Sequence, residues 1–359
     1  MTRFLQLHFL TSFAASNLNR DDSGSPKNIR IGNTKRLRIS SQSLKRAWRT
    51  SDTFQQALGG NIGTRTRRLG IKIYEDLIAG GIDEKNAEEI AIKIVGVFTD
   101  NEDKKENKLE TKQLFHISPQ ELQSVNALVA EICASKATPK NDDERYKLLR
   151  KEHTAADIAA FGRMFASNPE KNSDAAVQVA HAFTVHPATE EDDYFTAVDD
   201  LKSKEQSGSG FLGVAYLGAG VYYSYICVDM PLLLENLGGN LDLAERTITA
   251  LIECASTVAP TGKQNSHASR AYAHYILAEA GHQVPRQLSL AFVQPITSAT
   301  VVEDSIKALE TTEGAFEKMY GACRNAFARA NFVQQEGSLN EIKNFAQEHI
   351  RAVHGATKG

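Results

Sequence analysis

Alternating apolar and polar positions mark the strands of this chain. Residues 4–10 alternate leucine and phenylalanine with Gln6 and His8, the period of two that is typical of a half-buried strand. Three later runs rich in β-branched and aromatic residues predict further strands: Val221–Met230, Tyr272–Ala278 and Gln287–Val293.

Apolar positions three and four residues apart predict helices between these strands. Ser40 or Ser41 stands where a helix N-cap stands, before a stretch that has no Gly or Pro until Gly59. Further helices are predicted at Ala175–His186, Leu241–Val258, Val301–Arg329 and Leu339–Val353, and residues 60–169 form a helical block rich in Lys, Glu and Ala. This order predicts an α+β fold with a helical insertion after the first strand and helix.

Two segments fit neither period. Residues 11–39 are rich in Asn, Ser, Asp, Gly and basic residues and predict a long loop, which in a compact protein is usually functional or disordered. Residues 203–220, SKEQSGSGFLGVAYLGAG, combine Gly and Ser with apolar side chains, which predicts a flexible hairpin with an apolar tip.

Length and composition narrow the class of protein. The 359 residues allow two domains of about 150 residues each or one domain with a large insertion. The 42% apolar and 24% charged residues exclude disordered and collagen-like chains. No apolar run approaches about 18 residues and no signal-peptide pattern is present, so we expect a cytoplasmic protein without a membrane partner. The four cysteines form no CxxC pair, so no zinc or redox motif is predicted.

Charge is distributed unevenly along the chain. Residues 1–72 hold 14 Lys or Arg against three Asp, a balance of +11, whereas the remaining residues hold 27 basic and 41 acidic side chains, a balance of −14. Positive charge concentrated on an otherwise acidic protein suits a surface that binds a polyanion along one track. A solvated basic face is the alternative interpretation.

The sequence context argues against a dinucleotide-binding motif and against a metal site. Gly208, Gly210 and Gly213 match the dinucleotide pattern GxGxxG, but a charged run precedes them and strand-like sequence follows, so we expect no cofactor. The aspartates of residues 192–200 are the candidates for holding a cation, but acids beside turns are usually solvated. We therefore assign no catalytic residue and no metal ligand, and expect that the protein is not an enzyme.

The predicted first helix carries the clearest binding pattern. Gln42, Lys45 and Arg49 fall on one polar stripe, whereas Leu44 and Trp48 form an apolar pair that faces the core. One face of the helix is therefore available to a ligand while the other packs.

The start of the same helix favours an anion. The free amides of its first turn and the hydroxyls of Ser40 and Ser41 suit a phosphate, and Lys45 adds positive charge one turn further along. Such contacts bind the backbone of a nucleic acid and not its bases. Arg46 either joins this surface or forms an internal salt bridge.

Short motifs along nearly the whole chain point to one family. They are Asn19–Asp22 (NRDD), Arg38–Ala47 (RISSQSLKRA), Ala180–Ala182 (AHA), Phe195–Leu201 (FTAVDDL), Ser207–Gly213 leading to Gly220–Tyr223 (GVYY), and Gly262–Gln264 (GKQ). These motifs and their order resemble CasC, the backbone-forming subunit of the type I-E CRISPR Cascade surveillance complex.

The resemblance implies a fold and a function. The fold is a ferredoxin-like, RRM-like palm (residues 1–58 and 172–359) with helical fingers inserted at residues 59–171 and a Gly-rich β-hairpin thumb at residues 194–221. Copies of such a subunit polymerise head to tail along a CRISPR RNA (crRNA), grip its phosphate backbone and kink it at regular intervals, so that the bases between kinks pair with target DNA. The implied partners are crRNA, target DNA, other copies of the chain, and the large subunit, small subunit, crRNA 5′-end cap subunit and crRNA-processing endonuclease of the complex.

The resemblance also implies contacts, residue by residue. The residues implied to grip the RNA backbone are Arg20, Lys27, Ser40, Gln42, Lys45 and Arg49. Arg46 is added to them because of its charge, and Lys263 is a weaker candidate. Met164 and the thumb residue Leu212 flank the kinked nucleotide, and Tyr194 and Phe195 lie at the base of the thumb; core packing is the alternative for Met164 and Phe195. Three lysines on one predicted helical face of the fingers are candidates for contacting target DNA: Lys104, Lys108 and Lys112.

Two other functions stay open from the sequence. A crRNA-processing endoribonuclease of similar fold needs a general base beside the RNA, and residues 11–55 contain no histidine. A generic single-strand nucleic-acid-binding protein would assemble on RNA without partner subunits.

Overall fold

The structure is a computed structural model that describes residues 2–99, 108–137, 144–150, 154–165, 169–197, 211–322 and 324–358. The chain divides into two compact units: the first comprises Met1–Phe54, Gln178–Val228 and Ile248–Gly359, and the second Gln55–Val177 and Asp229–Thr247. Among the helices of these described ranges, none combines the length and apolar character that crossing a membrane requires.

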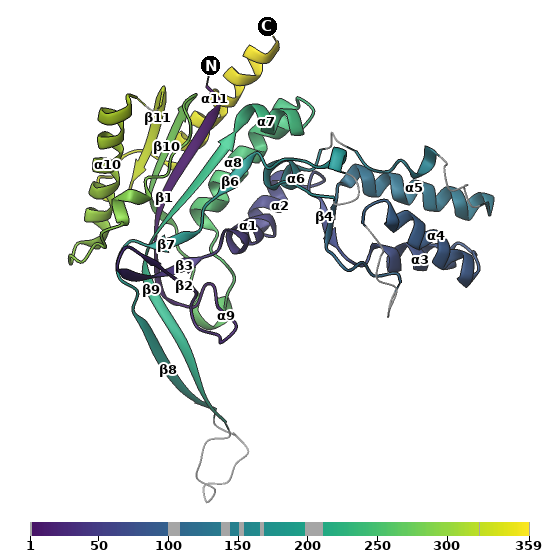
Figure 1. The fold of residues 1–359 in the computed structure, drawn as a ribbon, viewed down its shortest axis with the longest axis horizontal. Helices are drawn as coiled ribbons and strands as arrows, with labels where there is room; N and C mark the ends of the chain where they lie inside the picture. Colours follow the sequence, from purple (N-terminus) through teal and green to yellow (C-terminus); the bar gives the residue numbers. More distant parts are fainter. Residues whose placement is uncertain are drawn as a thin grey trace, which may run out of the picture. The chain divides into compact units, whose positions relative to one another are not determined.

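In the described residues, a nine-stranded sheet forms the centre of the first unit (Figure 1). Its main path runs β11-β10-β1-β9-β7-β3-β2, and β6 and β8 also pair with β9. The strands are β1 (Phe4–Ser16), β2 (Asn28–Ile31), β3 (Thr34–Ile39), β6 (Val177–Val179), β7 (Ala182–Thr184), β8 (Glu190–Ala197), β9 (Phe211–Asp229), β10 (Ala273–Gly281) and β11 (Ala326–Asn331). β1 and β10 pair antiparallel, so strands far apart in sequence lie side by side.

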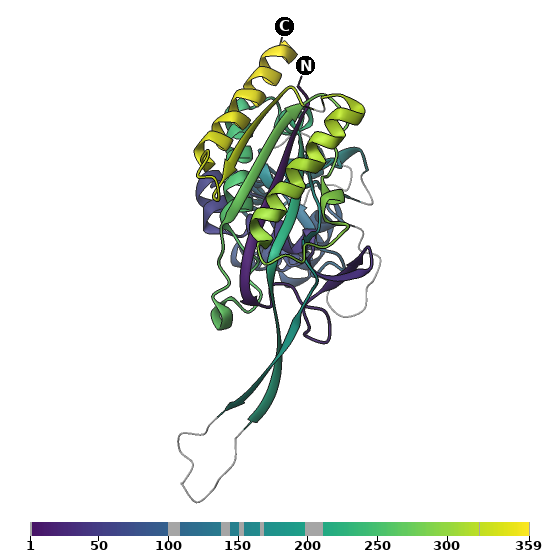
Figure 2. The same cartoon turned by 90° about the vertical axis from the view of Figure 1, so that its left-hand side faces the viewer.

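Helices cover both faces of this sheet (Figure 2). α10 (Val301–Tyr320) packs on one face, where its Ile306 and Leu309 join Tyr223 and Leu277 in a buried cluster. α11 (Leu339–Lys358) packs against β10 and β11 from the other side, close to α8 (Leu241–Thr257). β1 lies between these layers and is buried continuously over residues 5–11, so it is not the half-buried strand that its alternation predicted.

The segment predicted as a loop, residues 11–39, contains strands instead. β1 continues to Ser16, and β2 and β3 form a hairpin whose turn includes Gly32 in the left-handed region, with φ of +59°. The many polar and basic residues gave the segment a loop-like composition, although Arg36, Leu37 and Ile39 of β3 are buried.

Other expected elements differ in type or length. Residues 175–186 were expected to be helical but contain β6 and β7, and residues 287–293 contain a 3₁₀ turn, η3 (Ser289–Phe292), instead of a strand. The expected first helix divides into α1 (Ser41–Arg49) and α2 (Asp52–Leu58), and the expected helix 301–329 stops at Gly321 before β11. The helices expected from Leu241 and from Leu339 are confirmed as α8 and α11.

A two-stranded arm extends from the sheet of the first unit (Figures 1 and 2). β8 pairs with the start of β9 from Glu190 opposite Gly218 to Ala197 opposite Phe211. The predicted hairpin of residues 194–221 falls within this arm, apart from residues 198–210, which lie outside the described residues.

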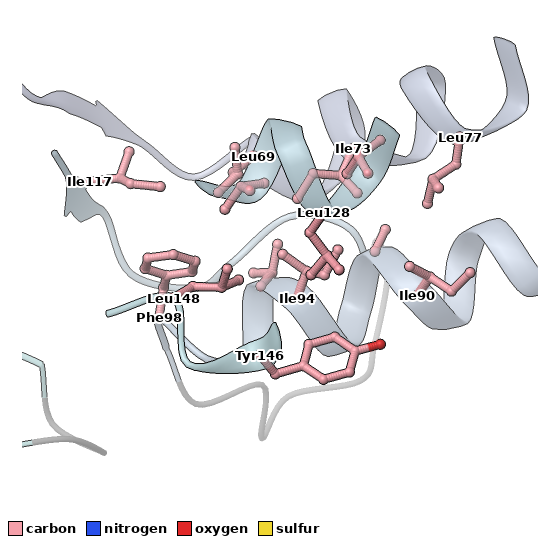
Figure 3. Packing of buried hydrophobic residues seen from close by; sticks show 14 of the residues in the cluster. Leu69, Ile73, Leu77, Ile90, Ile94, Phe98, Ile117, Leu128, Tyr146 and Leu148 are labelled. Carbon is pink, nitrogen blue, oxygen red and sulfur yellow. The ribbon is translucent and has the colours of Figure 1, made fainter. Parts of the chain in front are cut away.

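The second unit is mainly helical. Its elements are β4 (Thr64–Thr66), α3 (Leu69–Ala79), α4 (Glu84–Gly96), β5 (Phe115–Ile117), α5 (Pro119–Ser135), η1 (Glu144–Tyr146), α6 (Ala156–Phe161), η2 (Pro169–Lys171) and α7 (Met230–Asn236). Ile73, Ile94 and Leu128 from three helices meet in its buried core (Figure 3). The helices predicted in residues 60–169 are therefore confirmed, with β4 and β5 as a small sheet among them.

The two units differ from the predicted division of the chain at three places. Residues 55–58, 172–177 and 229–247, which the prediction gave to the palm, group with the helical unit. The mixed α+β class with a large antiparallel sheet is confirmed, and the assignment of the units as palm and fingers stays a prediction.

Candidate nucleic-acid interface

Three side chains hold the N-terminus of α1. Ser40 is the N-cap, and its Oγ accepts a hydrogen bond from the Ser43 amide at 3.3 Å. Asn19 Oδ1 accepts from the amide of Ser40 at 2.9 Å, and His181 Nδ1 accepts from the amide of Ser41 at 3.3 Å. The prediction that the first-turn amides are free for a phosphate is therefore wrong for Ser41 and Ser43.

The two faces of α1 are divided as predicted. Leu44 and Trp48 are buried, and both line a small cavity in the interior of the first unit. Gln42 is exposed, and Lys45 and Arg49 are half-buried on the other face. Within the described residues, the backbone N–H of Gln42 has no protein acceptor. This part of α1 therefore offers a backbone donor together with two positive charges.

A hollow of about 600 Å³ lies next to α1, which contributes Ser43, Arg46 and Ala47 to its lining. Arg20 and Arg46 both line it, and both are exposed. Asp21 also lines the hollow, but its carboxylate accepts hydrogen bonds from the backbone amides of Ser23 and Ser25. A further hydrogen bond from the Ser23 hydroxyl lowers the pKa of the Asp21 carboxyl. No ion pair of Arg46 is found in the described part of the chain, so the internal salt bridge that the sequence left open is not observed.

Arg38 and His181 lie beside the N-terminus of α1, although their sequence context predicted no role for them. Arg38 Nη1 lies 3.0 Å from His181 Nδ1, and β3 pairs with β7 next to both residues. Partial desolvation of the ring lowers the pKa of His181, and the positive charges of Arg38, Lys27 and Lys45 lower it further. The only signal in the sequence was that Arg38 and His181 each stand in one of the motifs, because their separation of 143 residues hides the contact.

The loop that follows α8 closes the hollow at Thr261 and Gly262. A Cβ at Gly262 would lie 2.5 Å from the carbonyl oxygen of Leu18 and 2.8 Å from that of Asn17. Only glycine allows this approach, which holds the loop against the segment leading to Arg20. Lys263, the weaker predicted contact, is half-buried and adopts φ of +47° just before the short helix α9 (Gln264–His267).

Replacing Gly262 by alanine is expected to destabilise the first unit by about 1–3 kcal/mol, because the methyl group clashes with fixed backbone. The measurement is the midpoint of thermal unfolding. The control is Gly314→Ala in α10, where a Cβ meets nothing within 4 Å and alanine is expected to stabilise the helix. Equal midpoints for Gly262→Ala and the wild type would contradict the close approach.

The predicted thumb residues lie on the described strands of the arm. Tyr194 is 62% exposed and Leu212 is 55% exposed. Tyr194 is opposite Val214 and Thr196 is opposite Leu212, so Tyr194 and Leu212 share one face of the arm, whereas Phe195 lies on the other. Phe195 is 44% exposed, which does not fit full core packing.

The remaining predicted contacts belong to the second unit. Met164 is 79% exposed, so core packing is wrong for this residue. Lys108 lies in a turn 3.9 Å from the Glu88 carboxylate, and Lys112 lies in a bend; the expectation that they share a helical face is wrong. Lys104 lies outside the described residues.

The described residues contain no group of three or more His, Cys, Asp or Glu placed to hold a metal ion. Asp192 and Asp193 are consecutive on β8 and therefore point to opposite faces of the arm. The two aspartates do not form a common cation site.

Comparisons with known proteins agree with this architecture. The model of the family described as CT1975-like protein matches residues 5–354. A chain from a "CRISPR RNA-guided surveillance complex, pre-nicking" is similar in structure, with a TM-score of 0.81 and 28% identity over 98% of this chain and 99% of that chain. A chain from a "CRISPR RNA-guided surveillance complex" has a TM-score of 0.71 and 23% identity over 98% and 99%, which supports the fold alone. No curated protein matches this sequence.

Proposed function

The chain belongs to the family of CT1975-like proteins, and from that membership we propose that it is the RNA-binding backbone subunit of a CRISPR RNA-guided surveillance complex. The family match and the structural similarity confirm the resemblance to CasC. The proposal adds that the subunit acts in a type I-E complex in the cytoplasm and holds the crRNA by its phosphate backbone while the bases stay open to target DNA.

The observation that carries this proposal is the basic surface around α1. Lys45 and Arg49 lie on one face of the helix, and Arg20 and Arg46 line the adjacent hollow. This surface concentrates positive charge in a chain whose net charge is −3. Arg and Lys side chains with one open amide suit phosphate oxygens of any sequence, which is what a scaffold for variable guide RNAs requires.

The sheet supports the proposed ferredoxin-like palm. The four strands β10, β1, β9 and β7 are neighbours in this order. Numbered by their place in the chain, they follow the order 4-1-3-2, with α1 after the first strand and α8 after the third. That is the arrangement of the βαββαβ motif in ferredoxin-like and RRM-like folds.

The arm supports the proposed thumb. Its exposed Tyr194 and Leu212 share a face and expose apolar surface to solvent, which in a soluble protein usually marks a contact site. We propose that this face displaces one nucleotide from the stack and kinks the RNA. Head-to-tail contacts between copies would repeat the kink along the RNA, and such heterologous contacts need other subunits to cap the ends. Contacts of the finger lysines with target DNA belong to the same proposal.

The rival function is a crRNA-processing endoribonuclease. Among the residues that the structure describes, His181 lies next to the start of α1, but its Nδ1 already accepts from Ser41 and contacts Arg38. We propose a non-catalytic scaffold, in which this histidine has a binding role. Site-specific cleavage of a labelled repeat RNA by the purified chain would support the endoribonuclease instead.

Co-expression of the full chain with its neighbouring subunits and a CRISPR array tests the proposal. We expect the purified assembly to have a high A260/A280 ratio that falls after RNase treatment, and to contain RNA of one discrete length. The matched control is the same co-expression without the array. A ratio typical of bare protein in both preparations would contradict the scaffold function, and assembly on RNA by this chain alone would favour generic single-strand binding.

A further inference from the structure

His181 receives two hydrogen-bond donors on one ring nitrogen. Its Nδ1 lies 3.0 Å from Nη1 of Arg38 on β3 and 3.3 Å from the amide nitrogen of Ser41 on α1. His181 lies between β6 and β7 in the chain, whereas its contacts Arg38 and Ser41 belong to β3 and α1. The ring therefore connects two parts of the first unit that are far apart in sequence.

The donors determine the protonation state of the ring. A guanidinium group and a backbone amide donate hydrogen bonds and accept none, so Nδ1 has to be the acceptor. The proton of the neutral imidazole then lies on Nε2. Partial desolvation of the ring and the neighbouring charges of Arg38, Lys27 and Lys45 lower the pKa of His181, which agrees with a neutral ring at pH 7.

The Nε2–H group remains available for a ligand. His181 is exposed, and no partner of Nε2 is found among the residues that the structure describes. Three cations lower the pKa of the ring by their charge: Arg38, Lys27 and Lys45, of which Lys45 lies on α1. A further cation here would repel them in the RNA-free chain, whereas a neutral donor adds a directed contact without that cost.

We propose that His181 is an RNA-contacting residue: its Nε2–H donates a hydrogen bond to a backbone oxygen of the RNA while Nδ1 orients Arg38 and the start of α1. This inference rests on the proposed RNA-binding function. The proposed contact is neutral, whereas the sequence predicted this surface mainly from its charged residues.

Two replacements separate the two nitrogens. In His181→Asn, the side-chain oxygen takes the place of Nδ1 as the acceptor for Ser41 and Arg38, but no donor remains at the position of Nε2. His181→Leu removes both functions. Lys45→Gln serves as the reference, because it removes one positive charge from the same surface.

The experiment measures binding of a labelled single-stranded crRNA at increasing salt to the full-length chain supplied together with its partner subunits. The thermal unfolding midpoint of the chain is measured as well. We expect His181→Asn to bind about fivefold to tenfold more weakly, with an unchanged salt dependence and an unchanged midpoint. Lys45→Gln is expected to reduce the slope of log affinity against log salt by about 0.7, because one phosphate contact is lost. His181→Leu is expected to lose affinity and to unfold at a lower temperature.

Three outcomes would overturn the inference. If His181→Asn binds like the wild type, the ring acts only through Nδ1. If His181→Asn reduces the salt slope by about 0.7, the ring is charged on RNA and is not a neutral donor. If neither the wild type nor Lys45→Gln shows salt-dependent binding, the proposed function itself fails, a result distinct from a failure of His181 alone.

Discussion

Replacing Lys45 and Arg49 together by glutamate is expected to abolish RNA retention by the assembled complex. The change converts the charges on the exposed face of α1 from +2 to −2 without touching the buried Leu44 and Trp48. Each charge-assisted contact with a phosphate contributes about 1.5–3 kcal/mol, so losing two and adding repulsion lowers RNA affinity by about a hundredfold or more. The measurement is the A260/A280 ratio of the purified complex and its RNA content on a denaturing gel.

A matched double replacement controls for the change in net charge. Lys307→Glu with Lys318→Glu makes the same change on α10, and Lys318, like Arg49, lies in the last turn of its helix. Both doubles therefore carry a similar penalty at a helix C-terminus, where negative charge is unfavourable. We expect the α10 double to retain RNA at the level of the wild type.

A neutral pair keeps the result interpretable if the glutamate double folds poorly. Lys45→Gln with Arg49→Gln adds no negative charge to the helix and is expected to lose RNA partially, with unchanged far-UV circular dichroism. Full RNA retention by the folded glutamate double would show that the basic face of α1 is only solvated. The proposed function would then need another RNA-binding surface.

The sequence predicted α1 well because several local signals agree there. Ser40 is the N-cap as expected, and the apolar pair and the polar stripe fall on the expected faces. The hairpin of β2 and β3 was missed because its basic residues, one of which (Arg36) is fully buried, obscure the alternation of Leu37 and Ile39. Residues 175–186 were predicted as a helix instead of two strands, because a short apolar run with alanines fits the period of a helix and that of a strand equally well.

The candidate site could be predicted where it depends on sequence neighbours. The basic residues of α1 and the preceding segment lie within 30 residues of one another, so their charge and helical spacing were visible. The contact between Arg38 and His181 depends on the pairing of β3 with β7, and no local pattern reports such a pairing. The close approach at Gly262 is equally invisible, because it involves the backbone of Asn17 and Leu18.

A buried polar network on β1 was missed entirely. The alternation in residues 4–10 predicted that Gln6 and His8 face solvent, yet both are buried under the helical layer. His8 Nε2 lies 3.1 Å from the Glu279 carboxylate, and Tyr223 Oη lies 3.0 Å from His8 Nδ1. Arg286 binds both carboxylate oxygens of Glu279, at 2.8 and 3.0 Å.

Glu279 balances the charges of this network. Its side chain is fully buried, as is that of His8, and Arg324 lies 3.8 Å from one of its oxygens. Burial raises the pKa of the carboxyl, but hydrogen bonds from His8 and Arg286 outweigh this effect and lower the pKa to about 2. Burial keeps His8 neutral by lowering its pKa. Glu279 is therefore the negative partner of two poorly exposed arginines.

Replacing Glu279 by glutamine is expected to lower the free energy of unfolding of the first unit by about 3–5 kcal/mol at pH 7. The replacement keeps the shape of the side chain but leaves the charges of Arg286 and Arg324 without this carboxylate. The pKa of Glu279 is depressed in the folded chain, so its contribution is complete above an unfolded pKa of 4.5 and is lost as the pH falls toward 2. The difference between wild type and variant should therefore be large at pH 7 and shrink steadily below pH 4.5 in urea unfolding curves.

The surface pair of Glu253 with Lys343 provides the control for this prediction. Its glutamate side chain is 42% exposed, so Glu253→Gln is expected to cost less than about 1 kcal/mol at any pH, because exposed ion pairs contribute little. If Glu279→Gln lowered the free energy of unfolding by no more than Glu253→Gln does, the first unit would not depend on the carboxylate charge for its stability. If the cost of Glu279→Gln were large but independent of pH, the loss would come from packing. Only a large cost that fades with acid identifies the carboxylate charge as the element that holds β10 to the loop of Arg286.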